Sequence, residues 1–350
     1  MDGLIVHDVR NANGSIHFRV VGSLLRSHLP NLHPGIHQTV VDTFASELMS
    51  GGKTFNEWTS VRIFPMVKNL IRTTNSLVFF GKDLTNDAEY LKALLQYPED
   101  VVSTSEVLRF TPTFLAPVVA SIMMRRGRAV KHLVKSLLPV VEQRMKRNSQ
   151  DSEQMDIFQW MIGSSPKKSP WLATKIVQVT LGLWFGSIHQ PAMAIVYALY
   201  DLCQHPQYIE ALREEMTRCE ENKTGDPFEE MVLLDSFLKE SARFSPSDSR
   251  ELPKLRLAKL PFENPSIDTV SVSLRRKAIA PYTFTDGLSV KFGDVACVPM
   301  RAMMRDESKY PNARTFDGYR FVTDSQRDSV AKLTDVETKF PIWGYGRRAW

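Results

Sequence analysis

Residues 171–203 read WLATKIVQVTLGLWFGSIHQPAMAIVYALYDLC, and this is the most apolar stretch of the chain. Its length would suffice for a membrane-spanning helix, which needs about 20 apolar residues. Polar side chains recur along it, however, and they are costly inside a bilayer: Lys175, Gln178, His189, Gln190 and Asp201. The stretch therefore predicts a long helix through the centre of a soluble protein.

The residues before this stretch show helical periodicity, with apolar side chains recurring every three or four positions. Pro34 suits the first turn of a helix. Pro112 and Pro117 divide an apolar stretch into short pieces, because proline interrupts helical hydrogen bonding. The sequence predicts helices at 34–50, 60–80, 88–96 and 128–147, short apolar pieces at 106–124 and a polar loop at 150–170.

The residues after this stretch begin as helices and end as short strands. One helix is predicted from His205 to about Cys219, and a second ends at Arg243. Asp286-Gly287 is a hairpin-turn signal. Runs typical of β-strands follow the helices, at 270–274, 280–284 and 295–299. We therefore predict a mainly α fold with a small β region, in a single domain over residues 1–350.

The composition is that of an ordinary globular protein. Hydrophobic residues make up 43% and charged residues 24% of the 350 residues, which excludes a disordered or collagen-like chain. The 44 basic and 39 acidic residues leave a formal charge of +5, too small to indicate a nucleic-acid partner. The three cysteines lack metal-site spacing and favour a reducing compartment. The first residues lack the pattern of a signal peptide or membrane anchor.

Three histidines lie close together in the sequence. His33 and His37 are four residues apart, a spacing that places two metal ligands on one helix face, and His28 precedes them. Pro34 and Gly35 lie between the pair, and no other type of ligand is near. We expect surface or capping histidines here and no metal site.

A basic run follows the apolar pieces and could attract phosphate. It lacks the interleaved aromatic residues that a single-strand nucleic-acid binder needs. We expect a solvated helix face, with contact to a membrane surface as the minor alternative. The run comprises Arg125, Arg126, Arg128, Lys131, Lys135, Arg144, Lys146 and Arg147.

Three motifs occur in order in the second half of the chain. Glu240 and Arg243 are three residues apart on a predicted helix, so they face the same side and can pair. Residues 316–321 (FDGYRF) place Arg320 between aromatic residues in a loop. Residues 340–349 (FPIWGYGRRA) form a loop punctuated by glycines. The glutamate–arginine pair alone is weak evidence, because many helices contain one.

Together these motifs resemble the cytochrome P-450 family of haem-thiolate monooxygenases, most of all its fungal secondary-metabolism members. Residues 185–191 (FGSIHQP) resemble that family's oxygen-activating segment, and residues 200–209 and 212–215 resemble the segment after it. The resemblance runs from about residue 25 to the end. It implies a cytochrome P-450-like fold that is incomplete.

The resemblance also implies roles for individual residues. Glu240, Arg243 and Arg320 correspond to a buried structural cluster that supports the haem-side core. His189 and Gln190 correspond to the catalytic pair that manages proton delivery, although an amide cannot relay a proton as a hydroxyl does. The positions that correspond to cofactor binding are Arg275 or Arg276 and Arg348 for the haem propionates, and Trp343, Gly344 and Gly346 around the proximal haem face.

The sequence departs from the family pattern at several points. The position of the axial cysteine is occupied by Trp350, and an indole is a donor only. It cannot replace a thiolate, whose electron donation favours O–O cleavage, so no metal ligand is predicted. Residues 249–268 interrupt the family spacing and are interpreted as an insertion. We expect the N-terminal anchor and the C-terminal haem-ligand segment to be missing, and our hypothesis is an unspliced intron or a decayed gene.

Two functions follow from this comparison. The first is a haem b monooxygenase that receives electrons from an NADPH-dependent reductase and oxidises an apolar small molecule, a terpenoid or polyketide. Residues 106–124 and 176–195 would then line the substrate pocket. The alternative is a non-catalytic remnant or mis-spliced product without haem chemistry, which Trp350 favours. The family implies the endoplasmic reticulum membrane, whereas a chain without an anchor is expected to be cytoplasmic.

Overall fold

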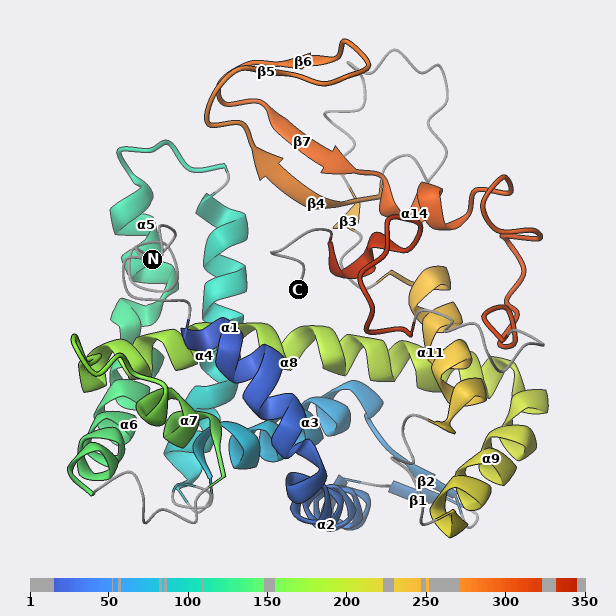
Figure 1. Cartoon of the computed structure of the whole chain (residues 1–350), viewed down its shortest axis with the longest axis horizontal. Coiled ribbons are helices and arrows are strands. Elements are labelled where there is room, and N and C mark those ends of the chain that lie inside the picture. The colour runs from blue at the N-terminus through green and yellow to red at the C-terminus, as the bar shows by residue number, and fades with distance from the viewer. Residues whose placement is uncertain are drawn as a thin grey trace. The chain divides into compact units, whose positions relative to one another are not determined.

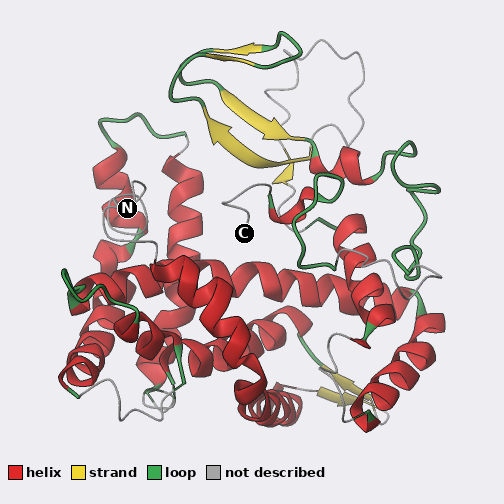
Figure 2. Ribbon diagram, viewed as in Figure 1, coloured by secondary structure: helices red, strands yellow, loops and turns green. Residues whose placement is uncertain are grey.

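The computed structural model describes residues 16–344, apart from 52, 56–57, 82–83, 85–86, 109, 148–154, 223–229, 247–249, 252–270 and 323–331. The chain divides into two compact units, Met1–Ala192 (unit 1) and Met193–Trp350 (unit 2). Helix α8 (Ala173–Gln204) contributes to both. Helices make up most of the described chain and strands are few (Figure 2). The predicted mainly α fold with a small β region is confirmed.

The described residues of unit 1 form helices and one short hairpin (Figure 1). Helix α3 packs on α2, and α4 packs on α5 and α6. The elements of unit 1 before α8 are α1 (Ile16–Arg19), η2 (Val20–Leu25), α2 (Arg26–Gly51), β1 (Lys53–Phe55), β2 (Trp58–Ser60), α3 (Ile63–Phe80), α4 (Ala88–Leu108), α5 (Ala116–Met123), η3 (Arg125–Gly127), α6 (Arg128–Lys146) and α7 (Ile157–Gly163).

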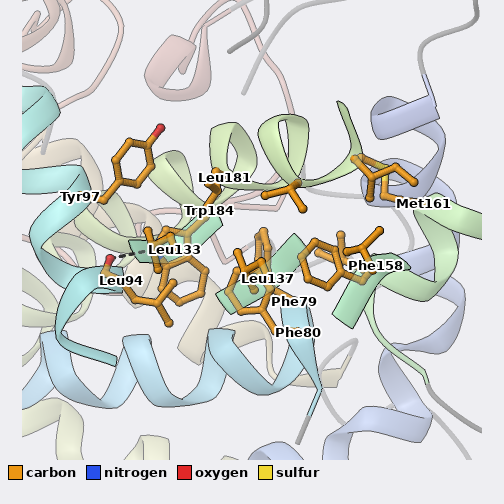
Figure 3. Close-up of a cluster of buried hydrophobic side chains, with 14 of the residues drawn as sticks. Phe79, Phe80, Leu94, Tyr97, Leu133, Leu137, Phe158, Met161, Leu181 and Trp184 are labelled. Atoms are coloured by element: carbon orange, nitrogen blue, oxygen red, sulfur yellow. Dashed lines mark hydrogen bonds between the residues drawn. The ribbon is translucent and has the colours of Figure 1, made fainter. Parts of the chain in front are cut away.

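The core of unit 1 forms around the first half of α8. Val177, Leu181, Trp184 and Ile188 are buried and recur at steps of four, three and four, so they share one helix face. Helix α8 is long and apolar enough to cross a membrane by length and composition, but this buried face is that of a core helix. Side chains from α3, α4, α6 and α7 converge in the same core (Figure 3): Phe79, Phe80, Leu94, Tyr97, Leu133, Leu137, Phe158 and Met161.

Helix α4 continues through an internal proline because a side chain replaces the lost hydrogen bond. Proline has no N–H, so the carbonyl four residues earlier loses its helical donor. Pro98 thus leaves the Leu94 carbonyl without one. The indole Nε1 of Trp184 donates to this carbonyl at 2.9 Å (Figure 3). The buried carbonyl is therefore satisfied from another helix.

The same arrangement occurs in α8. Pro191 removes the donor of the Ser187 carbonyl. Nδ2 of Asn75, on α3, donates to that carbonyl at 2.7 Å. Helix α8 therefore remains continuous through residues 185–191, the segment that resembles the oxygen-activating segment.

Arg144 forms a buried ion pair, so its assignment to a solvated helix face was wrong. Its Nη1 donates to both carboxylate oxygens of Asp156, at 2.8 and 2.7 Å, and its Nη2 donates to the Phe80 carbonyl at 3.2 Å. Asp156 also caps α7 by accepting from the N–H of Gln159 at 2.9 Å. The pair joins the ends of three helices.

Gly81 lies at the end of α3, against this ion pair. Its φ is +73°, and a Cβ there would lie 2.6 Å from Oδ2 of Asp156. We predict that Gly81→Ala lowers the free energy of unfolding by more than Gly127→Ala does, because the backbone of Gly81 (φ +73°, ψ −162°) lies in a region essentially restricted to glycine and its Cβ would meet Asp156. Gly127→Ala is the control, because φ is +70° there but the nearest atom to a Cβ is Lys131 Cε at 3.9 Å. Equal losses in urea denaturation would contradict a role for the Asp156 contact.

Unit 2 contains helices, a three-stranded sheet in the order β3-β4-β7 and a hairpin of β5 and β6. All pairings are antiparallel among the described strands. The hairpin turns at Asp286-Gly287, where the predicted glycine has φ +87°. The elements after α8 are η4 (Pro206–Tyr208), α9 (Ile209–Glu221), α11 (Val232–Phe244), β3 (Arg250–Glu251), β4 (Ser271–Lys277), β5 (Tyr282–Thr283), β6 (Ser289–Val290), β7 (Val295–Val298), α14 (Met300–Met304) and η5 (Pro341–Trp343).

Several predicted boundaries were wrong. Helix α2 begins at Arg26 instead of residue 34, and includes Pro30 and Pro34, which are exposed so that water can satisfy the freed carbonyls. Helix α4 extends to Leu108 instead of ending at residue 96. The predicted loop at 150–170 contains α7, whose N-cap is Asp156. Of the predicted insertion, Arg250 and Glu251 form β3, and residues 252–268 lie outside the described residues.

Candidate functional site

Glu240, Arg243 and Arg320 come together in unit 2 as a buried charged cluster. Arg243 donates to Glu240 from Nε at 2.6 Å and from Nη2 at 2.7 Å. Nε of Arg320 donates to Glu240 at 3.0 Å. The side chains of Glu240 and Arg243 are fully buried. A buried carboxylate needs several donors to offset its lost hydration, and Glu240 has them.

The two guanidinium groups of this cluster also bind backbone carbonyls of the loop that follows α14. Arg243 donates to the carbonyls of Met304 and Ala313, the latter at 2.8 Å. Arg320 donates to the Pro311 carbonyl at 2.5 Å and the Thr315 carbonyl at 2.9 Å. The cluster therefore fixes the course of residues 304–320. Its role in this geometry is structural.

The loop around Gly318 is held by residues that the sequence did not reveal. Oγ of Ser236 donates to the Gly318 carbonyl at 2.8 Å, and the Gly318 N–H donates to the hydroxyl of Tyr208 at 3.0 Å. A Cβ at position 318 would lie 2.9 Å from Tyr208 and 3.0 Å from Phe237. Only glycine fits this space. The FDGYRF pattern showed the glycine and Arg320 but not the three side chains that surround them.

His189 and Gln190 lie on α8 within unit 1. Nε2 of His189 and Oε1 of Gln190 are buried and have no hydrogen-bond partner among the described residues. Burial lowers the pKa of His189, the charge of Lys68 lowers it further, and Glu99 opposes both. His189 is therefore a neutral imidazole at pH 7, with one ring nitrogen available as an acceptor or donor. A buried polar atom without a hydrogen-bond partner lowers the stability of a fold, so stability does not explain these two side chains.

The glycine loop is described only at its start. Trp343 is half-buried and its Nε1 donates to the Leu333 carbonyl at 2.5 Å. Gly344 follows with φ +86°, a conformation that favours glycine. Gly346, Arg348 and Trp350 lie outside the described residues. Arg276 is exposed on β4, and the side chain of Arg275 is not among those described.

A small cavity of about 30 Å³ lies within unit 2, which is about the space of one water molecule. Its walls come from α8, α11 and the segment before the glycine loop: Ala194, Tyr197, Leu238, Ser241, Ala242, Ser245, Leu333, Ile342 and Trp343. Ser241 donates to Oδ2 of the buried Asp201 at 2.6 Å.

Asp201 provides a test of the polarity beside this cavity. Burial raises its pKa, while the Ser241 hydrogen bond and the charge of His205 act in the opposite direction. When the pKa of a carboxyl is higher in the folded state than in the unfolded state, the protein becomes less stable as the pH rises from the lower pKa to the higher one. We predict that Asp201→Asn becomes more stable relative to the wild type between about pH 4 and about pH 7.

Asp306→Asn is the control for the Asp201 prediction, because hydrogen bonds from Ser308 lower the pKa of Asp306. Its stability relative to the wild type should change little over the same pH interval, since a carboxyl with a lowered pKa loses its stabilising effect only at pH values below its unfolded pKa. Urea denaturation at the two pH values measures both variants. Parallel behaviour of the two variants would contradict the assignment for Asp201.

The model of the cytochrome P450 family matches residues 26–264, more than half of the chain. The chain belongs to the cytochrome P450 family. Similar fungal relatives are the cytochrome P450 monooxygenases olcJ of Penicillium canescens, 27% identical over 96% of this chain, and AN1598 of Emericella nidulans, 28% over 87%. The monooxygenase janQ of Penicillium janthinellum is 30% identical over 71%.

The chain spans only part of these relatives, 61%, 54% and 45% of their respective lengths. Solved structures show the same fold. The retinoic acid-bound cyanobacterial CYP120A1 has a TM-score of 0.65 at 16% identity, with 95% of this chain and 65% of that chain covered. The cytochrome P450 CYP102L1 has a TM-score of 0.64 at 16% identity, with 95% and 70% covered.

Cytochromes P450 carry haem, receive electrons from redox partners and act on small molecules. The thiolate that this chemistry requires is not supplied by the residues of the glycine loop. The three cysteines of the chain lie elsewhere: Cys203 is exposed at the end of α8, Cys219 is buried in α9, and Cys297 is exposed in β7. These positions differ from the one in the glycine loop that the resemblance assigns to the axial ligand.

The histidines of the sequence cluster and the predicted pocket segments have the following surroundings. His28 stacks on Trp160 with ring centroids 5.2 Å apart. Among the described residues, no group of three or more His, Cys, Asp or Glu side chains could hold a metal ion. Of the predicted pocket segments, residues 176–188 contribute to the packed core of unit 1, whereas Phe114 and Ile122 are exposed.

Proposed function

We propose that the chain is part of a cytochrome P450 monooxygenase of fungal secondary metabolism that oxidises an apolar small molecule, a terpenoid or a polyketide. The observation that supports this most is the buried Glu240–Arg243–Arg320 cluster in a chain that the family model matches. Its fungal relatives are named as cytochrome P450 monooxygenases, which supports the proposed type of reaction. The proposal extends to an NADPH-dependent reductase as electron donor and to the endoplasmic reticulum as location.

In this proposal the residues of the chain have separate tasks. The charged cluster holds residues 304–320 in place. His189 presents a neutral ring nitrogen in a buried position, and Gln190 presents an unpaired amide oxygen that is able to accept a hydrogen bond. Haem, when bound in the family, supplies the oxygen-activating chemistry. No step of that chemistry is assigned to this chain, because position 350 carries an indole.

A second candidate, a non-catalytic member of the family, is favoured by Trp350 alone. An indole nitrogen donates a hydrogen bond and has no lone pair for iron. This form would keep the fold of the family without its oxidative chemistry.

Haem titration separates the two candidates. We expect the purified chain to show no long-wavelength Soret band of a thiolate–carbonyl complex when haem, dithionite and CO are added, and Trp350→Cys to produce that band. Cys203→Ser in the Trp350→Cys background is the control, and it should keep the band. A band in the unaltered chain would overturn the assignment of position 350. No band in Trp350→Cys would favour the non-catalytic candidate.

A further inference from the structure

The loop that joins α7 to α8 contains a serine–proline–lysine motif. Residues 164–172 read SSPKKSPWL. Within them, residues 165–168 (SPKK) place a proline directly after a serine and a lysine three positions after it. This is the substrate pattern of those proline-directed protein kinases that also select a basic residue at the third position after the serine.

Each position of this pattern has a physical reason. Proline lacks a backbone N–H, so it fits a kinase pocket that offers no hydrogen-bond acceptor, where another residue would leave its N–H unsatisfied. A lysine at the third position can pair with an anionic group of the kinase. The sequence contains four serines or threonines followed by proline, and of these Ser165 alone has a basic residue at the third position; the others are Thr111, Ser169 and Ser245.

The loop presents the motif at the surface in a turn. The N–H of Ser169 donates to the Pro166 carbonyl at 3.2 Å, which closes a turn with the two lysines at its tip. The tip is exposed and Ser165 is half-buried. The hydroxyl oxygen of Ser165 accepts from the N–H of Trp171 at 2.7 Å. Both hydrogen bonds lie within the loop, so the motif can extend into a kinase groove without unfolding either helix.

The surroundings of Ser165 favour a negative charge. Residues 157–200 include no Asp or Glu. The two lysines of the turn are exposed and have no carboxylate partner among the residues that the structure describes. The ammonium of Lys175 lies over the ring of Trp171, 4.2 Å from its centroid. A phosphate on Ser165 would therefore meet cations and a backbone N–H, whereas phosphorylation disrupts a structure where it meets carboxylates or an apolar wall.

We propose that Ser165 is phosphorylated by a proline-directed serine kinase and that the phosphate strengthens the attachment of the loop to the start of α8. In the reaction, the hydroxyl oxygen of Ser165 bonds to the γ-phosphorus of ATP, the bond from that phosphorus to the bridging oxygen breaks, and ADP leaves. The hydroxyl proton passes to a base of the kinase. The phosphate then accepts from the Trp171 N–H and from the lysines of the turn. The free cysteines favour a reducing compartment, where ATP and protein kinases occur.

Incubation of the full chain with ATP and a cyclin-dependent kinase tests the site, and mass spectrometry of the peptides locates the phosphate. We expect a single phosphate, on Ser165. Ser165→Ala should abolish the modification. Ser169→Ala is the control and should keep it, because Ser169 also precedes a proline but has no basic residue at the third position. Phosphate on Ser169 instead, or no phosphate on a chain that circular dichroism shows to be folded, would overturn the assignment.

Two lysine variants keep the serine and test the pattern around it. Lys168→Ala should slow phosphorylation about tenfold, because it removes a charge-assisted contact with the kinase. Lys167→Ala makes the same charge change at the neighbouring exposed residue and should leave the rate unchanged. Equal rates for the two variants would show that the kinase does not read the third position, and would contradict Ser165 as its selected target.

The melting temperature of the phosphorylated chain tests the effect of the added charge. At about pH 7.5 it should lie about 2 °C above that of the same chain after phosphatase treatment. The gain should shrink at about pH 5, because a phosphate monoester loses charge below its pKa of about 6. An unchanged or lower melting temperature would contradict the proposed contacts with Trp171 and the lysines. Neither measurement involves haem, so failure of this site leaves the proposed monooxygenase function unaffected.

Discussion

Replacing Arg243 by alanine is expected to lower the free energy of unfolding by about 3–5 kcal/mol, because it leaves the carboxylate of Glu240 buried with too few donors. Arg243 has no exposed surface, and it also donates to the Met304 and Ala313 carbonyls. The same substitution therefore frees buried carbonyl oxygens on the loop that ends at residue 320. Urea denaturation followed by circular dichroism measures the loss.

Arg213→Ala is a matched control for this prediction. Arg213 pairs with Glu210 at 2.8 Å with the same three-residue spacing, but the two side chains are 71% and 76% exposed. Exposed pairs contribute about 0–1 kcal/mol, so this loss should be small. If Arg243→Ala and Arg213→Ala lower the free energy of unfolding equally, the buried cluster contributes no more to stability than an exposed ion pair does. Arg243→Lys should recover little of the loss, because an ammonium cannot bind two oxygens and two carbonyls in the same plane.

Replacing Trp184 by alanine is expected to cost about 3–5 kcal/mol, the usual range for removing a large buried aromatic side chain. Trp184 is fully buried and packs against Phe79 and Phe80 with ring centroids 5.5 and 5.2 Å apart. Trp184→Phe keeps most of the packing and removes the indole N–H. It should cost about 1–3 kcal/mol, because the Leu94 carbonyl then remains buried without a donor.

Pro98→Ala isolates the hydrogen-bond component of this prediction. An alanine at 98 restores the helical N–H to the Leu94 carbonyl, so Trp184→Phe should cost less in that background. The difference between the two costs is the coupling energy of a double-mutant cycle, and about 1–2 kcal/mol is expected. Additive effects would mean that the indole N–H does not compensate for the proline. Thermal unfolding followed by far-ultraviolet circular dichroism measures the stability of the four proteins in the cycle: the wild type, the two single variants and the double variant.

The sequence allowed the charged cluster to be predicted, and packing explains why its surroundings were not. Glu240 and Arg243 share a helix face, and the resemblance to a family supplied Arg320. The carbonyls that both arginines bind belong to an irregular loop, whose course has no periodic signal. Ser236 was missed for the same reason, since a serine on a buried helix face carries no motif.

Prolines and charges caused most of the errors in the predicted elements. The helix predicted from apolar periodicity ended at residue 96, whereas α4 continues through Pro98. The sequence does not show that the indole of Trp184, 90 residues after Leu94, donates to the Leu94 carbonyl. Arg144 followed a run of exposed basic residues, yet it lies two residues from the end of α6, where it contacts Asp156 and the Phe80 carbonyl. The local sequence pattern predicts that Arg144 is exposed, whereas its tertiary contacts show that it is buried.

The two proline compensations constrain the order in which such residues can arise in evolution. An indole at 184 or an amide at 75 is tolerable before its proline appears, because each can fill space beside an intact helix. The reverse order leaves a buried carbonyl without a donor, at about 1–3 kcal/mol, for as long as the donor is absent. Ancestral chains with Trp184 and a non-proline residue at 98 should therefore outnumber chains with the opposite combination, and the same asymmetry should hold for Asn75 and Pro191.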